Sequence, residues 1–215
     1  RSSAASDVYK RQVMGRVDSV LEDVCRSPGH PLETRLRGWM QASRTFTAFV
    51  EANASKVRRK LRVTDPAALA DVDTELAVAA WLLRERRWTL VYEPLAASGG
   101  RGPDVRVAAP DGSGAFFVEV TRLRGGAVPL TLARSLADKV GQLPAGAVTV
   151  LAAVLPPGVE GPEMLSQALR LLEQAVHPTG ETLGSLDARA FARGRHRLGA
   201  AVSYTHLTLP TSDLV

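Results

Sequence analysis

The sequence predicts an α/β protein in which a helical region comes before an α/β core. Three observations indicate this class. Apolar residues recur at helical spacing as far as Arg87. The period then changes to alternation at Val105 and Val107, which are followed by the hairpin turn sequence Pro110-Asp111-Gly112-Ser113-Gly114. The run from Ala147 to Leu155 is apolar on both sides, which is typical of a central strand.

The N-terminal region, residues 13–64, is expected to be helical. Val13 to Cys25 carries its apolar residues on one side, and Leu32 to Leu61 forms one long helix or two. That segment ends in the basic run Lys56-Val57-Arg58-Arg59-Lys60. A phosphate-contacting patch is one interpretation of this run. A solvated helix face is the other, and it is favoured because charge runs are usually exposed helix.

The core is expected over residues 65–201. Asp65 as N-cap and Pro66 at the first helical position begin its leading helix, on which Glu75 borders the buried face. The expected elements that follow are a strand over Trp88–Tyr92, a strand with Val105 and Val107, a strand over Ala115–Thr121, a helix over Leu130–Leu143, a strand over Ala147–Leu155, helices over Pro162–Val176 and Leu186–Arg193, and a last strand that begins near Leu198.

Charge and cysteine content restrict the function classes only loosely. The net charge of +5 at pH 7 permits a nucleic-acid partner without requiring one. Cys25 is the single cysteine, so an internal disulfide is excluded, and we expect a reducing, cytoplasmic location. No apolar run reaches membrane-spanning length, so we expect no membrane association. The oligomeric state stays open.

Three acidic residues stand out when they are placed on these elements. Glu75 lies on the leading helix, Asp104 opens the second strand, and Glu119 lies near the end of the third. Because a hairpin sets the start of one strand beside the end of the next, Asp104 and Glu119 are expected to be neighbours, and Glu75 can approach from the packed helix. Clustered carboxylates repel one another, and a hard divalent cation relieves this repulsion and can activate water.

The pattern resembles the PD-(D/E)XK nuclease superfamily over Asp71 to Leu155. The resemblance rests on Glu75, on Pro103-Asp104 and on Glu119-Val120-Thr121. It implies a restriction-endonuclease-like fold, with a helix, a three-strand meander, a helix and a strand. It also implies that Asp104, Glu119 and the Val120 carbonyl hold Mg²⁺ or Mn²⁺, that Glu75 assists, and that the partner is a nucleic acid, most simply DNA.

The sequence departs from the family at the motif lysine, which Thr121 replaces. Threonine cannot supply the positive charge that positions or activates water, so we expect Lys139 on the following helix to substitute, with Gln142 assisting one turn away. The catalytic set expected from the resemblance therefore consists of Asp104, Glu119, Lys139, Glu75, Thr121 and Gln142.

Simpler interpretations of the same residues stay open. Asp104 after Pro103 can be a turn residue, Glu119 a surface position on an edge strand, and Glu75 one more helix charge. The leading functional hypothesis is a metal-dependent nuclease that hydrolyses phosphodiester bonds. The second is a nuclease-fold protein that has lost catalysis and acts as a binding or scaffold module, which the missing lysine favours. The third is an α/β domain whose acids are unrelated.

Other chemistry has weak support in the sequence. His30, His177 and His196 are scattered without metal-ligand spacing, and Cys25 is expected to be a buried apolar residue rather than a nucleophile. The loop Gly99-Gly100-Arg101-Gly102 lacks the Gly-Lys-Ser/Thr ending of a phosphate-binding loop. It is expected to be a flexible lead into Asp104.

The two ends of the chain are related through their possible coding DNA. Ser2 to Gln12 reads SSAASDVYKRQ, and one codon choice for it has a reverse complement that translates, in a shifted frame, to VSYTHLTLPT, the sequence of Val202 to Thr211. Residues 1–12 and 202–215 therefore look like translated sequencing adapter. We expect both segments to be extended or loosely placed, although Val202 to Leu207 has the composition of a strand and can add to a sheet by accident.

Overall fold

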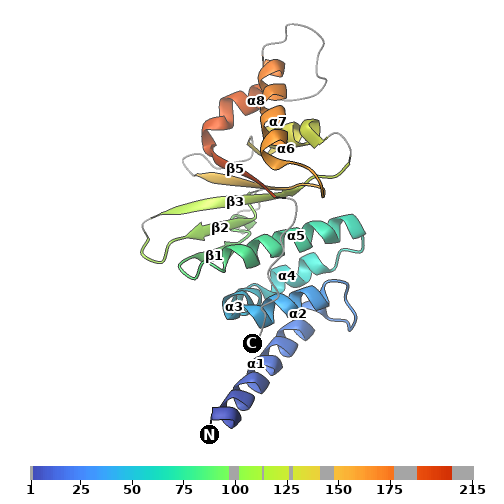
Figure 1. The fold of residues 1–215 in the computed structure, drawn as a ribbon, viewed down its shortest axis with the longest axis vertical. Coiled ribbons are helices and arrows are strands. Elements are labelled where there is room, and N and C mark those ends of the chain that lie inside the picture. The colour runs from blue at the N-terminus through green and yellow to red at the C-terminus, as the bar shows by residue number, and fades with distance from the viewer. Residues whose placement is uncertain are drawn as a thin grey trace. The chain divides into compact units, whose positions relative to one another are not determined.

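The computed structural model describes residues 2–96, 102–112, 114–125, 128–140, 148–176 and 188–204. The chain forms two compact units, and the boundary between them lies at Arg86 and Arg87. The first unit is helical and the second contains the sheet, so the described chain has the α/β class that the sequence predicts (Figure 1). None of its helices in the described ranges is long and apolar enough to cross a membrane.

The described part of the first unit contains five helices. They are α1 (Ser2–Cys25), α2 (Glu33–Ala42), α3 (Arg44–Ala52), α4 (Ala54–Leu61) and α5 (Pro66–Leu82). The largest side chains of these helices that lie fully out of solvent are Leu36, Met40, Phe46 and Leu76. Asp65 caps α5 as expected, because its carboxylate accepts a hydrogen bond of 2.9 Å from the Ala68 amide.

The segment from Leu32 to Leu61 is neither one helix nor two, but three. Ser43 leaves the helical conformation with φ −143° and ψ 110°, and its hydroxyl caps α3 by accepting from the Phe46 amide. Asn53 makes the second break, before α4. The apolar spacing runs through both breaks, so periodicity alone does not reveal them.

The basic run on α4 is occupied by acidic partners inside the same unit. Arg58 donates two hydrogen bonds of 2.6 Å to the Asp23 carboxylate on α1, and Lys60 forms an ion pair with Glu75 on α5. Both side chains are partly buried, with exposed fractions of 21% and 18%. These two cations join α4 to α1 and α5 through ion pairs. The contacts favour neither a phosphate-contacting patch nor a freely solvated helix face.

The second unit is built on a five-stranded mixed sheet in the order β1-β2-β3-β4-β5. The first three strands are antiparallel, and β3, β4 and β5 are parallel. The elements are β1 (Thr89–Tyr92), β2 (Val105–Ala108), β3 (Ala115–Arg122), α6 (Val128–Val140), β4 (Thr149–Val154), α7 (Gly161–Val176), α8 (Ala188–Gly194), the short 3₁₀ helix Arg195–Arg197 and β5 (Leu198–Tyr204).

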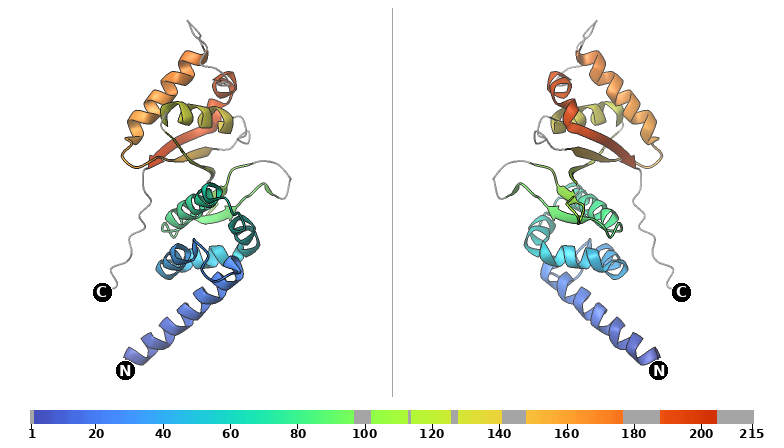
Figure 2. Two further views of the ribbon diagram at one scale, coloured as in Figure 1. Left: turned by 90° about the vertical axis from the view of Figure 1, so that its right-hand side faces the viewer. Right: turned by 90° about the vertical axis from the view of Figure 1, so that its left-hand side faces the viewer.

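Three helices of this unit, α6, α7 and α8, lie together on one face of the sheet (Figures 1 and 2). Leu132 and Leu136 of α6 pack with Leu172 of α7 and with Leu151 and Ala153 of β4 in a single buried cluster. Side chains alternate along a strand, so every residue in register with Leu151 or Ala153 also belongs to this helix-covered face. Glu119 and Thr121 are those residues on β3.

The strand over Ala147–Leu155 was predicted to be central, and β4 lies between β3 and β5 in the interior of the sheet. The hairpin turn is also confirmed: Gly112 has φ +71°, and the Ala109 amide donates to the Gly114 carbonyl at 3.1 Å. In register, β2 and β3 pair Val105 with Val118 and Ala108 with Ala115.

The N-terminal segment is not extended as expected, whereas the described part of the C-terminal segment adds to the sheet in the way its composition allowed. Residues 2–12 are helical and form the first turns of α1. They contain Ala, Lys, Arg and Gln, which favour helix, and they continue a helix whose stripe at Val17, Val20 and Val24 is buried. Val202 to Tyr204 does extend β5, in parallel register with β4.

Candidate functional site on the helix-covered face of the sheet

The β2–β3 hairpin determines where Asp104 and Glu119 lie. Val105 pairs with Val118, so continuing the antiparallel register by one residue sets Asp104 opposite Glu119. The Glu93 amide donates a 2.7 Å hydrogen bond to the Asp104 carbonyl, so the β1–β2 ladder also continues to this level. Residues directly opposite in an antiparallel pair carry their side chains on the same face. Asp104 and Glu119 therefore share the face covered by α6.

Asp104 lies in a bend just before β2, and its carboxylate takes the place of a backbone carbonyl as a hydrogen-bond acceptor for β3. Its Oδ2 accepts a hydrogen bond of 2.8 Å from the Val120 amide, in the position where a longer β2 would supply a carbonyl. The amide and the carbonyl of one strand residue face the same neighbouring strand, so the Val120 carbonyl faces the side on which Asp104 lies. The carboxylate of Asp104 thus belongs to the fold as well as to the candidate site.

Glu119 is a buried carboxylate in the middle strand of the sheet. Only 5% of the residue is exposed, and β3 has neighbours on both sides. The interpretation of Glu119 as a surface position on an edge strand is therefore wrong. A buried carboxylate requires a partner, and the ammonium of Lys139 supplies one by donating a hydrogen bond to Glu119 Oε1.

The spacing on α6 explains why Lys139 reaches the sheet. Leu132 and Leu136 point into the core beneath α6, and Lys139 follows them by seven and three residues on the same stripe. Lys139 lies in the last turn of the helix, where a cation is also favoured by the helix dipole. Its side chain remains 34% exposed, against 7% for that of Glu119, so the ammonium lies at the border between core and solvent.

Thr121 follows Glu119 by two residues and belongs to the same face of β3. It is partly buried, and it is in register with Ala153 of β4. A longer side chain at this position would extend beneath α6 on the same face as Glu119. Gln142 lies outside the described residues, as do His177 and the loop residues 99–101.

Glu75 belongs to the first unit, where its carboxylate pairs with Lys60. The two side chains are 16% and 18% exposed, so the pair is largely shielded from water. The hydrogen bond joins α4 to α5 across 15 residues of sequence. This contact gives Glu75 a structural role, whatever further role it has.

Among the described residues, no three His, Cys, Asp or Glu side chains gather closely enough to hold a metal ion by themselves. Magnesium does not require three, because it is commonly held by one or two carboxylates and retains several waters. Asp104, Glu119 and the carbonyl of Val120 offer oxygen donors of the type that Mg²⁺ prefers.

His30 has a structural role, and Cys25, expected to be buried, is half-buried. His30 joins the start of α2 to the end of α4, since its ring nitrogens contact the Leu61 carbonyl at 3.1 Å and the Leu32 amide at 3.2 Å. Burial raises the pKa of Cys25 to about 11, with a further contribution from Glu33 that exceeds the opposing effect of Arg37. A thiol with so high a pKa is protonated at neutral pH and is a poor nucleophile.

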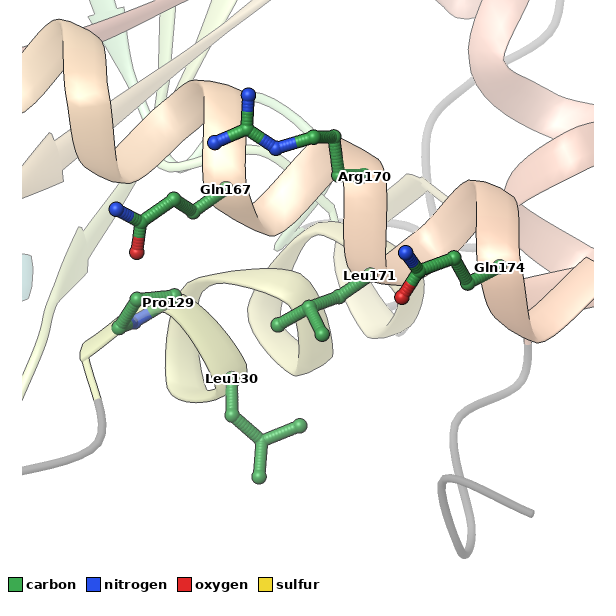
Figure 3. A pocket seen from close by; sticks show the side chains of 6 residues that line it. All are labelled: Pro129, Leu130, Gln167, Arg170, Leu171 and Gln174. Atoms are coloured by element: carbon green, nitrogen blue, oxygen red, sulfur yellow. The ribbon is translucent and has the colours of Figure 1, made fainter. Parts of the chain in front are cut away.

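An open groove of about 390 Å³ lies between α6 and α7 (Figure 3). Pro129, Leu130 and Leu171 give it apolar walls, and Gln167, Arg170 and Gln174 lie along α7. None of the site residues predicted from the sequence lines it. The groove therefore offers apolar contact and amide groups, but not the carboxylates on which the predicted chemistry depends.

Sequence reasoning did not single out Glu93, which immediately follows β1. Its amide holds Asp104 in place, and its backbone has φ +45°, an uncommon conformation for a residue with a side chain. A Glu-Pro pair directly after a strand, next to the hairpin that carries Asp104, is the sequence signal that could have identified it.

In comparisons with protein-family models, curated proteins and solved structures, nothing matches this chain.

Proposed function

We propose that the chain is a divergent PD-(D/E)XK-type nuclease with a restriction-endonuclease-like core, which hydrolyses phosphodiester bonds of DNA with Mg²⁺ or Mn²⁺. The observation that carries this proposal is the contact between Lys139 and Glu119. The family places a lysine two residues after the second acid, and here that position is Thr121. An ammonium brought to the same carboxylate from α6 supplies the missing charge.

The order of elements from α5 to β4 supports the same proposal. A helix, three antiparallel strands, a helix and a strand parallel to the third follow one another as the resemblance implies. Asp104 and Glu119 would hold the ion with the Val120 carbonyl, and the bound ion would polarise a water and stabilise charge on the phosphate. Lys139 would orient that water and offset the charge of Glu119. Thr121 and Gln142 are auxiliary in this proposal, and Glu75 is the assisting acid of the helix.

A second candidate, a nuclease-fold protein that binds nucleic acid without cleaving it, is favoured by one observation. Both carboxylates already have partners in the protein, since Asp104 accepts from Val120 and Glu119 is paired with Lys139. Such contacts hold the two acids in place even if no ion binds. This candidate predicts DNA binding that survives the loss of Glu119.

A cleavage assay separates the two candidates. Purified protein would be incubated with supercoiled and linear DNA in Mg²⁺, in Mn²⁺ and in EDTA. We expect cleavage that requires the metal and that Glu119→Gln abolishes, while Glu163→Gln, an exposed carboxylate on α7, leaves it unchanged. Metal-dependent cleavage that survives Glu119→Gln would overturn the site, and DNA binding without any cleavage would favour the second candidate.

A further inference from the structure

The helix layer of the second unit ends partway across the sheet. One row of residues in register runs from β1 to β4 through Val91, Arg106, Phe117 and Thr149. Val91 is 45% exposed, Arg106 and Phe117 are partly buried, and Thr149 is 0% exposed. The buried cluster beneath the helices takes its strand residues from β4, and partly buried residues of β5 pack against it, whereas it includes no residue of β1 or β2 among the described residues. The same face is therefore open over β1 and β2.

The candidate site lies at this border. Glu119 lies two residues along β3 from Phe117 on the same face, and continuing the register by one residue puts Asp104, in the bend before β2, opposite Glu119. Lys139 marks the margin of the helix layer with its partly exposed side chain. A substrate that reaches these acids can therefore lie along the open part of the face, which Arg106 occupies.

Arg106 has an unusual electrostatic situation for a residue in this position. It makes no hydrogen bond, ion pair or ring contact with any residue in the described ranges, although Asp104 lies two positions before it on the same face. Its neighbours in the row, Val91 and Phe117, are apolar and can support only the aliphatic stem. Arg106 is partly buried as a residue and its charge has no anionic partner among the described residues, so the position is suited to an anionic ligand.

We propose that Arg106 binds a backbone phosphate of the nucleic acid, next to the phosphate that the acids and Lys139 would address. This inference rests on the proposed function. Arg is suited to the role because its planar fork donates two parallel hydrogen bonds to one phosphate and keeps its charge at every physiological pH. An additional cation is also required on physical grounds, because Asp104 and Glu119 repel a polyanion.

Binding can be tested apart from cleavage. A short fluorescein-labelled DNA duplex would be titrated with wild-type protein and with Arg106→Ala, Arg106→Gln and Arg106→Lys, with Ca²⁺ in place of Mg²⁺, and anisotropy recorded over a range of salt concentrations. We expect Arg106→Ala and Arg106→Gln to raise Kd about tenfold, because both variants lose the charge-assisted hydrogen bonds of the guanidinium fork. We also expect the slope of log K against log salt to become shallower by about one.

The lysine variant and a control arginine make the test specific. Arg106→Lys retains the charge but not the fork, so we expect the salt slope of the wild type with an intermediate Kd. Arg170→Ala removes an exposed arginine on α7, and we expect it to leave both quantities unchanged. Circular dichroism melts of all variants exclude unfolding as the cause. Competition with inorganic phosphate distinguishes a site for free phosphate from a site for the polymer.

The outcomes separate this inference from the proposed function. Cleavage by the wild type, with DNA binding that is unchanged in Arg106→Ala and Arg106→Gln, overturns the role of Arg106 and leaves the nuclease proposal intact. Arg106-dependent binding without cleavage supports the role of Arg106 and overturns the catalytic proposal. Stronger competition by free phosphate than by DNA overturns the nucleic-acid ligand. A wild type that neither binds nor cleaves DNA overturns both.

Discussion

Lys139, in the last turn of α6, donates a hydrogen bond to the buried carboxylate of Glu119 on β3, 20 residues away in the sequence. The contact crosses from the helix layer to the sheet and neutralises a buried acidic side chain beneath α6. Removing either partner therefore has consequences for stability as well as for chemistry.

We expect Lys139→Met to lower the free energy of unfolding by about 1–3 kcal/mol, because it leaves the Glu119 carboxylate buried without its cation. The estimate is below that for a fully buried pair because Lys139 is 34% exposed. The double variant Lys139→Met/Glu119→Gln should recover part of the loss. Urea unfolding of the four proteins measures the coupling, and simple additivity would show that the pair contributes nothing.

Introducing a lysine at position 121 directly tests whether Lys139 substitutes for the motif lysine. We expect Lys139→Met to slow metal-dependent cleavage about 100-fold, the typical effect of removing one charged donor from a reacting centre. Thr121→Lys in the same background should restore part of the rate, because position 121 shares the face of Glu119. Initial cleavage rates measure this, with Thr121→Met in the same background as the control. Equal rates in the two double variants would show that a cation at position 121 does not serve the site.

The ion pair between Lys60 and Glu75 distinguishes a structural acid from a catalytic one. We expect Lys60→Met and Glu75→Gln each to lower stability, with a coupling of about 0.5–2 kcal/mol in a double-mutant cycle, because both side chains are mostly buried. Chemical denaturation measures the cycle. Cleavage by the same variants then tests the role implied by the family. A rate loss that is larger for Glu75→Gln than for Lys60→Met would assign Glu75 to the site as well.

The placement of Asp104 and Glu119 could be predicted because it depends on local signals. The turn at Pro110–Gly114 and the alternation of Val105 and Val107 determine the hairpin register, and the register determines which residues are opposite. Lys139 was expected from the family resemblance; its spacing from Leu132 and Leu136, which puts it on the buried stripe of α6, is a second signal in the sequence. In both cases the information lies in a short stretch of sequence, a hairpin or a single helix.

The remaining features depend on contacts between distant segments. Ser43 ends α2 through its backbone conformation, although the apolar stripe continues through it, so periodicity suggested a longer helix. The pairing of Arg58 with Asp23 and of Lys60 with Glu75 requires the packing of α4 against two other helices. The open half of the sheet face, on which Arg106 lies, depends on how far the helix layer extends. No pattern within β2 indicates that extent.

The raised pKa of Cys25 predicts that the free energy of unfolding depends on pH in the alkaline range. The pKa of Cys25 is raised from its ordinary value of 9.0 to about 11, mainly by burial. Between these values the unfolded chain has lost the proton and the folded chain still holds it, so stability should fall as pH rises from 9 to about 11. Below pH 9 both states hold the proton, so Cys25 should not contribute to the pH dependence of stability. Thermal melts of wild type and Cys25→Ala over this range isolate the contribution, because other groups titrate equally in both proteins.

The same shift should slow alkylation. Iodoacetamide reacts with the thiolate, so we expect slow labelling of the folded protein at pH 8 and a rate that rises as pH approaches about 11. Labelling in urea at pH 8 gives the rate of the unprotected thiol. Equal rates with and without urea would contradict the protection of Cys25.

The two roles of Asp104 can be separated by a pair of substitutions. Its carboxylate accepts the Val120 amide at 2.8 Å and, in the proposed function, also holds the metal ion. Asparagine retains an oxygen acceptor but not the charge, whereas alanine loses both. We expect Asp104→Ala to lower stability by about 1 kcal/mol, the contribution of one hydrogen bond, and Asp104→Asn to lower it less. Both should lose Mg²⁺ binding in calorimetry and cleavage in the DNA assay. Asp138→Asn, which removes an exposed carboxylate next to Lys139, should retain both activities. If Asp104→Asn binds Mg²⁺ like the wild type, Asp104 serves only as a hydrogen-bond acceptor for the Val120 amide, and the metal site assigned to this hairpin is wrong.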